Sequence, residues 1–239
     1  MSRIHDAMMR AQQEQERTNP GRLAVSNRRG RPLDTVPTAY ERVVQRILGA
    51  PQDPNVILVV SAVAAEGAST VARNLATALD RGEGNRVVLV DANLRTPSQH
   101  HAFGVPPING LSDVVTGSIP LTSAVRNGFG LGLSVLACGR SPKGPGEVLA
   151  LRGFRSNIME LRSQFEWVII DGPPVTTYPD ASTLARVSDG VVLVLQAEST
   201  RWEVAEEARK VLEASRAPIL GVVLNRRKYH IPPFIYRRL

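Results

Sequence analysis

Short apolar runs alternate along the chain with longer segments whose apolar residues recur at helical spacing. The runs are rich in Val, Ile and Leu and have the length of buried strands; they cover residues 55–61, 86–91, 133–137, 167–171, 190–195 and 218–224. The helical segments cover residues 38–48, 71–79, 110–115, 147–165 and 200–214. Strands that alternate with helices predict an α/β fold with a doubly wound, mostly parallel sheet that helices cover on both faces.

The apolar stripes of two helical segments predict which side chains face the core. In segment 147–165 the inward stripe consists of Val148, Leu151, Phe154, Ile158 and Leu161. In segment 200–214 it consists of Trp202, Ala205, Ala208 and Leu212. We expect these side chains to pack on the sheet.

The segment between the first strand and its helix has the layout of a phosphate-binding loop. Such a loop reads G-x-x-x-x-G-K-[ST]; its backbone N–H groups cradle phosphates, its lysine neutralises them, and its hydroxyl reaches Mg²⁺. Here the second glycine is Gly67 and the hydroxyls are Ser69 and Thr70, but Ala62 replaces the first glycine and Ala68 replaces the lysine. The loss of that charge removes a term that commonly contributes several kcal/mol to phosphoryl transfer.

Polar residues end several of the predicted strands. Asp91 and Asp171 each close an apolar run, and ligands of open α/β sheets bind beyond the carboxyl ends of the strands. Each aspartate alone could be a turn or cap residue. Together with Ser69 they predict a Mg²⁺ site, because a loop hydroxyl and a strand-end aspartate are common Mg²⁺ ligands in nucleotide enzymes. Asn225, also at a strand end, could bind a base or cap a turn.

The composition of the chain predicts its cellular compartment and its division into domains. A single cysteine, Cys138, excludes an internal disulfide and fits a reducing compartment, and the longest apolar run is far shorter than a membrane span of about 20 residues. We therefore expect a cytoplasmic protein. Residues 1–37 predict a short amphipathic helix and a basic flexible linker, residues 38–227 a P-loop NTPase-like domain, and residues 228–239 a basic tail.

The formal net charge of +7 is concentrated near the two ends of the chain. Arginines are dense between Arg22 and Arg31, and the C-terminal region carries Arg226, Arg227, Lys228, Arg237 and Arg238. Basic ends suit solvated tails, anionic lipid, an acidic partner or nucleic acid. Nucleic acid is the least expected of these, because no recognition helix or basic patch with interleaved aromatic residues is present.

Taken in order, the motifs resemble the bacterial tyrosine-kinase family. This family comprises cytoplasmic P-loop proteins of polysaccharide biosynthesis and export that are relatives of the MinD/ParA ATPases. The matching segments are 61–70, 88–97, 110–114, 145–149, 168–174, 180–181 and 220–225. The resemblance covers nearly the whole chain and implies the P-loop NTPase architecture.

The resemblance also implies a site and partners. It implies Asp91 as the catalytic residue, Mg²⁺ on Ser69, Asp91 and Asp171, and nucleotide contacts from Glu66, Gly67, Ala68, Ser69, Thr70, Arg95 and Asn225. The implied cofactors are ATP and Mg²⁺. The implied partner is an inner-membrane polysaccharide co-polymerase, with the chain at the cytoplasmic face of that membrane, self-assembly as a further option, and membrane contact either indirect or through the basic termini.

Several positions depart from the family pattern. The loop lysine falls at Ala68, and the second aspartate of its D-x-D-x-R motif falls at Asn93. Both substitutions argue against bound ATP and Mg²⁺. The oligomerisation pattern of a glutamate and two arginines falls near Thr38, Glu41 and Val44, and the tyrosine-rich tail is reduced to two residues, which are Tyr229 and Tyr236.

Three classes of function remain open. The first is a degenerate member, or pseudokinase, that acts as a subunit or regulator of a membrane polysaccharide machine. The second is an active tyrosine autokinase or ATPase in which arginines from a partner replace the lysine. The third is a MinD/ParA-like positioning ATPase that uses its basic ends on a membrane or on DNA.

Overall fold

The fold is described here from a computed structural model. The structure describes residues 38–227 apart from positions 52, 82–85, 128, 130, 131 and 141. The predicted N-terminal helix, the linker and the basic tail with Tyr229 and Tyr236 lie outside the described residues. No helix among the described residues is both long and apolar enough to cross a bilayer.

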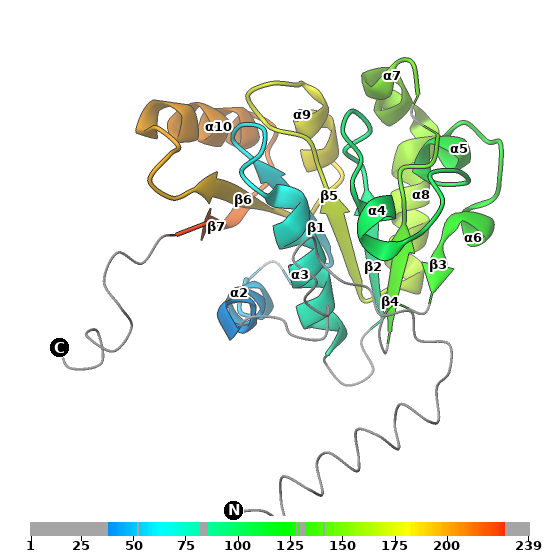
Figure 1. The fold of residues 1–239 in the computed structure, drawn as a ribbon, viewed down its shortest axis with the longest axis horizontal. Helices are drawn as coiled ribbons and strands as arrows, with labels where there is room; N and C mark the ends of the chain where they lie inside the picture. The colour runs from blue at the N-terminus through cyan, green and yellow to red at the C-terminus, as the bar shows by residue number, and fades with distance from the viewer. Residues whose placement is uncertain are drawn as a thin grey trace, which may run out of the picture.

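A seven-stranded sheet with the order β3-β4-β2-β5-β1-β6-β7 forms the centre of the fold (Figure 1). Its strands are β1 (Val56–Ser61), β2 (Val87–Asp91), β3 (Arg126–Asn127), β4 (Leu133–Leu136), β5 (Trp167–Asp171), β6 (Gly190–Gln196) and β7 (Ile219–Asn225). All neighbours pair in parallel except β3, which runs antiparallel to β4 at one edge. This arrangement confirms the predicted doubly wound, mostly parallel sheet.

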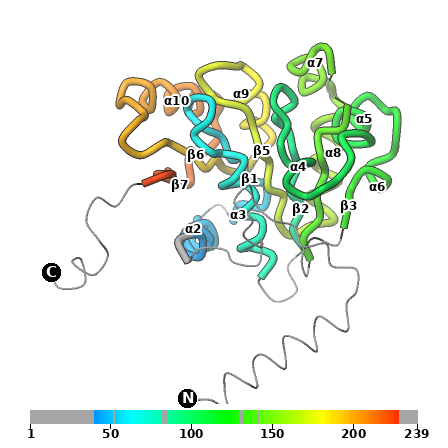
Figure 2. The backbone as a smooth tube through the Cα atoms, viewed as in Figure 1, coloured from blue at the N-terminus to red at the C-terminus, as the bar shows by residue number. Residues whose placement is uncertain are grey.

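Helices cover both faces of the sheet, as Figures 1 and 2 show. Alternate residues of β1 enter two separate cores, so that Ile57 faces one layer and Leu58 the other. The first layer contains α2 (Thr38–Leu48), α3 (Ala68–Asp80) and α4 (Gln99–Phe103). The second contains α5 (Leu111–Val115), α6 (Leu121–Ala124), α7 (Pro145–Ala150), α8 (Arg152–Gln164), α9 (Asp180–Ala185) and α10 (Trp202–Ala214).

Two predictions about helix faces are wrong in part. The expected single helix 147–165 is two helices, α7 and α8, because Leu151 adopts an extended backbone between them and is 46% exposed. Trp202 was expected to face inward, but it is 76% exposed at the start of α10. A helical stripe predicts the side that faces the core, whereas the end of a helix can project beyond the surface on which it packs.

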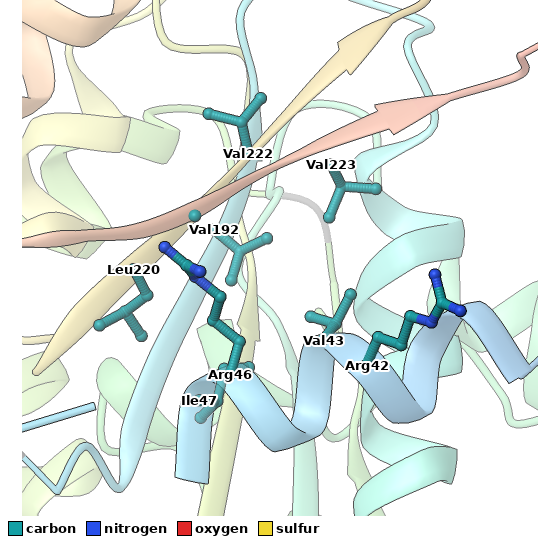
Figure 3. Close-up of a pocket in the computed structure, with 9 residues that line it drawn as sticks. Arg42, Val43, Arg46, Ile47, Val192, Leu220, Val222 and Val223 are labelled. Carbon is teal, nitrogen blue, oxygen red and sulfur yellow. The ribbon is translucent and has the colours of Figure 1, made fainter. Parts of the chain in front are cut away.

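The β7 edge of the sheet carries exposed apolar residues and a groove. Val222 and Leu224 of β7 are more than half exposed. A groove of about 330 Å³ lies between β7 and α2, and Figure 3 shows the side chains of Arg42 and Arg46 extending from α2 beside the apolar residues of β7. The groove is lined by none of the residues of the predicted phosphate-binding loop.

Candidate nucleotide-binding site

The loop between β1 and α3 keeps the shape of an anion-binding loop. Ala65 and Gly67 have positive φ values of 68° and 96°, and left-handed residues of this kind occur in the backbone concavities that bind anions. Helix α3 then begins at Ala68, and the first N–H groups of a helix have no acceptor within it. A Cβ at Gly67 would lie 2.2 Å from Asn225 Nδ2, so a larger residue would have to displace that side chain as well as adopt the positive φ. The loop can therefore still receive a phosphate through backbone donors.

Two of the predicted nucleotide contacts brace the loop in this structure. Glu66 is buried, and its carboxylate accepts hydrogen bonds from the Val63 N–H at 3.0 Å, from the Gln196 N–H at 3.2 Å and from the Thr200 hydroxyl. Asn225 Nδ2 donates to the Glu66 carbonyl at 2.7 Å. These bonds connect the loop to the carboxyl ends of β6 and β7. Both side chains therefore hold the loop backbone in position.

The predicted aspartates meet at the sheet edge. Asp91 and Asp171 are aligned partners at the ends of β2 and β5, and both are fully buried. Asp91 Oδ2 accepts hydrogen bonds from the N–H groups of Ser98 at 3.0 Å and Gln99 at 2.9 Å. Asp171 Oδ2 accepts one from Gln99 Nε2 at 2.7 Å, and Asp171 is also hydrogen-bonded to the Ser69 side chain. The Oδ1 atom of each aspartate has no hydrogen-bond partner.

Burial shifts the ionisation of this pair. Desolvation raises the pKa of Asp91 to about 8, and the negative charge of Asp171 adds to the shift. Desolvation also raises the pKa of Asp171 to about 6, while hydrogen bonds from Gln99 and Ser69 and the charge of Arg73 oppose that rise. Burial of the pair therefore keeps protons on these carboxyl groups at pH values where an exposed aspartate is ionised.

Sequence reasoning missed two members of the site. Gln99 Nε2 donates to the Ser69 carbonyl at 3.0 Å as well as to Asp171, and Arg73 Nη1 lies 3.5 Å from Gln99 Oε1. Arg73 stands four residues after Ser69 and so shares its helix face, a spacing that could have drawn attention to it. No comparable signal marks Gln99, which the sequence shows only as a polar residue after the Asp91 loop.

The other predicted residues lie around this centre with their own partners. Arg95 forms an ion pair with Asp180, with Nε and Oδ2 2.7 Å apart, and its guanidinium lies 4.2 Å from the ring centre of Tyr178. Asn93 Oδ1 accepts hydrogen bonds from the N–H and the hydroxyl of Thr96, which closes its own turn. Thr70 is exposed on the first turn of α3. The structure thus brings Ser69, Asp91 and Asp171 together but directs Arg95 to α9.

The residues present fit a divalent ion poorly. The two unpartnered carboxylate oxygens are hard ligands of the kind that Mg²⁺ prefers. However, within the described part of the chain no three His, Cys, Asp or Glu side chains could hold one ion. The amide of Gln99 presents a donor to Asp171, and the guanidinium of Arg73 adds a positive charge on the same side. The arrangement keeps the loop and the strand-end aspartates of a nucleotide site, but Ala68 presents no charge where the lysine of such a site would neutralise a phosphate.

Comparison with known proteins identifies the family to which the fold belongs. Residues 53–234 match the family described as ParA: NUBPL iron-transfer P-loop NTPase. The chain is 34% identical to the tyrosine-protein kinase YwqD of Bacillus subtilis strain 168 over 172 residues, which are 72% of each protein. It is 31% identical to the tyrosine-protein kinase CpsD of Streptococcus agalactiae over 174 residues, 72% of this chain and 76% of that one.

Solved structures of a kinase domain and of a MinD protein, among others, have a similar fold. The chimerical protein CapA2B2 has a TM-score of 0.76 at 31% identity, with 80% of this chain and 84% of the other covered. The VpsO kinase domain has a TM-score of 0.74 at 30% identity, covering 80% and 94%. MinD of Pyrococcus horikoshii OT3, complexed with Mg-ADP, has a TM-score of 0.62 at 25% identity, covering 77% and 76%. The chain therefore belongs to the ParA-like P-loop NTPase family, and its relatives within that family include bacterial tyrosine-protein kinases.

Proposed function

We propose that the chain is a tyrosine-kinase-like pseudokinase that serves as a cytoplasmic subunit or regulator of a membrane machine for polysaccharide biosynthesis and export. The observation that carries the proposal is Ala68 at the first position of α3, directly behind a loop that otherwise keeps its shape. Kinase relatives at 31–34% identity support the class of protein. The neutral Asn93, which bonds within its own turn, supports the loss of catalysis.

The loss of the lysine matters most for the charge that develops in the transition state. Phosphoryl transfer depends mainly on positioning and on cations that stabilise the phosphate oxygens. Backbone N–H groups around Gly67 can hold a phosphate in the ground state, but a methyl group at Ala68 offers no charge to the transferred group. Loss of one such contact commonly reduces turnover by about two to three orders of magnitude. The retained fold then serves to present surfaces to a partner.

We propose the partner from the kinase relatives of the chain. The proposed partner is an inner-membrane polysaccharide co-polymerase, with the chain held at the inner face of that membrane. Residues 38–227 would form the docking unit, and the basic segments 1–37 and 228–239 would add contacts to the partner, to anionic lipid or to further copies of the chain.

The proposal is tested by complementation in a strain that lacks the gene. The Asp91→Asn variant removes the candidate catalytic carboxyl and keeps the oxygen that accepts from Ser98 and Gln99. We expect it to restore polymer output to the wild-type level at equal protein abundance. A loss of polymer together with a loss of tyrosine phosphate would contradict the proposal.

An active kinase is the second candidate, and one observation favours it. Ser69 remains hydrogen-bonded to Asp171 beside a loop of phosphate-binding shape. If a partner supplies the missing cation, tyrosine phosphate would accumulate only when both proteins are present. Co-expression with the co-polymerase, followed by detection of phosphate on Tyr229 or Tyr236, distinguishes the two candidates.

A further inference from the structure

A guanidinium group is buried beneath the phosphate-binding loop. Arg73 lies on α3 one helical turn beyond Ser69, and only 8% of its surface is exposed. Side chains of a helix lean toward its N-terminus, which directs Arg73 toward the loop and the strand ends. Its Nη1 atom lies 3.5 Å from Gln99 Oε1, and its Nε atom has no hydrogen-bond partner. A charged group in this setting requires a compensating charge.

Asp171 supplies that compensation. Burial lowers the pKa of Arg73, and the negative charge of Asp171 opposes that shift. Tyr40 reaches this region from α2 and is hydrogen-bonded to Asn74. An unpaired buried ion is strongly unfavourable, and the charges of the guanidinium and the carboxylate oppose each other's burial penalty across the Gln99 side chain.

Gln99 connects the two charged groups. Its amide nitrogen donates to Asp171 Oδ2 at 2.7 Å and to the Ser69 carbonyl at 3.0 Å, while its amide oxygen faces Arg73. Its backbone N–H donates to Asp91 Oδ2 at 2.9 Å. One residue therefore contacts both aspartates, the loop helix and the buried cation.

We propose that Arg73, positioned by Gln99, is a built-in counter-charge for the Asp91–Asp171 pair that takes the place of a divalent ion, so that ligands bind at this site without Mg²⁺. A divalent ion on the two free Oδ1 atoms would have to approach the positive charge of Arg73, which already lowers the pKa of Asp171, and the like charges would repel each other. This inference concerns metal selectivity and goes beyond the proposed function. It holds whether or not the chain transfers phosphate.

The test is a titration of the full chain with Mn²⁺, an ion that electron paramagnetic resonance detects while it is free. Wild type is compared with Arg73→Met, which keeps an unbranched apolar side chain and removes the charge, and with Arg73→Lys, which keeps the charge. We expect Arg73→Met to bind one Mn²⁺ at least about tenfold more tightly than wild type, a difference of about 1.4 kcal/mol, because a nearby charge of like sign is removed. Arg73→Lys should behave as wild type does.

The Asp171→Asn/Arg73→Met double variant identifies the ion's position, and we expect it to lose the gained Mn²⁺ affinity. Equal Mn²⁺ affinity of folded Arg73→Met and wild type would overturn the proposal, as would tight binding by Arg73→Lys. If Arg73→Met does not fold, the proposal is tested by Mn²⁺ binding to wild type and to Asp171→Asn. Micromolar Mn²⁺ binding by wild type that Asp171→Asn abolishes would overturn the proposal, whereas only millimolar binding that Asp171→Asn leaves unchanged would support it.

Discussion

At the scale of single residues, the ends of β2 and β5 bring two buried carboxyl groups side by side. The convergence of Asp91, Asp171 and Ser69 could be predicted from the sequence, because parallel strands place their carboxyl ends at one edge and the loop precedes its helix there. Arg73 and Gln99 could not be predicted in the same way. Their role depends on the distance between α3 and α4, which no local pattern encodes.

The raised pKa values of the two aspartates make stability depend on pH. Both values, about 8 for Asp91 and about 6 for Asp171, exceed the ordinary 3.8, so the folded chain binds more protons than the unfolded chain. The free energy of unfolding should therefore fall as pH rises from about 5 to about 8, by up to about 1.4 kcal/mol per pH unit for each proton. Urea unfolding at several pH values measures this slope.

The Asp91→Asn variant serves as the control for that slope. It cannot ionise and keeps an oxygen acceptor for Ser98 and Gln99. We expect it to have a flatter pH profile and to exceed wild type in stability at pH 8. Identical slopes for the two proteins would show that Asp91 titrates normally.

At the scale of elements, the strands could be predicted more completely than the helices. The apolar runs are short, contain many β-branched residues and end at turn residues, so their positions follow from local pattern. The break between α7 and α8 could not be predicted in this way. Gly153 allows the first turn of α8 to approach Val115, where a Cβ would lie 2.8 Å from the carbonyl oxygen, and this contact is tertiary.

The junction of α5 with the loop after β4 supports a prediction about an element. A Cβ at Gly110 would lie 2.3 Å from the Ala137 carbonyl oxygen, and that oxygen accepts a hydrogen bond from the Leu111 N–H at 2.8 Å. We expect Gly110→Ala to lower the free energy of unfolding by about 2–3 kcal/mol, as overpacking against backbone does. Denaturant unfolding measures the change.

Gly221 of β7 offers a matched substitution. A Cβ there would meet no atom within 4 Å, so Gly221→Ala should change stability by less than about 0.5 kcal/mol. If the two variants destabilise the chain equally, the close approach at Gly110 is not a constraint on the fold.

At the scale of the whole molecule, the net charge of +7 predicts attraction to anionic surfaces. We expect binding to vesicles that contain phosphatidylserine to fall at least about fivefold between roughly 50 and 500 mM NaCl, because salt screens charges at the surface. Co-sedimentation measures the bound fraction, with phosphatidylcholine vesicles as the neutral control. Binding that is equal on both lipids and indifferent to salt would exclude an electrostatic role for the basic ends.

The most direct test of the account is calorimetric titration of wild type and the Ala68→Lys variant with ATP and ADP, followed by a tyrosine-phosphorylation assay on the same samples. Ala68→Met, which adds length without charge, is the matched control. We expect Ala68→Lys to bind at least about tenfold more tightly than wild type and Ala68→Met, because it restores a charge to the phosphates. Wild type should show no tyrosine phosphate with or without its membrane partner. Turnover or tyrosine phosphate in wild type would contradict the pseudokinase account.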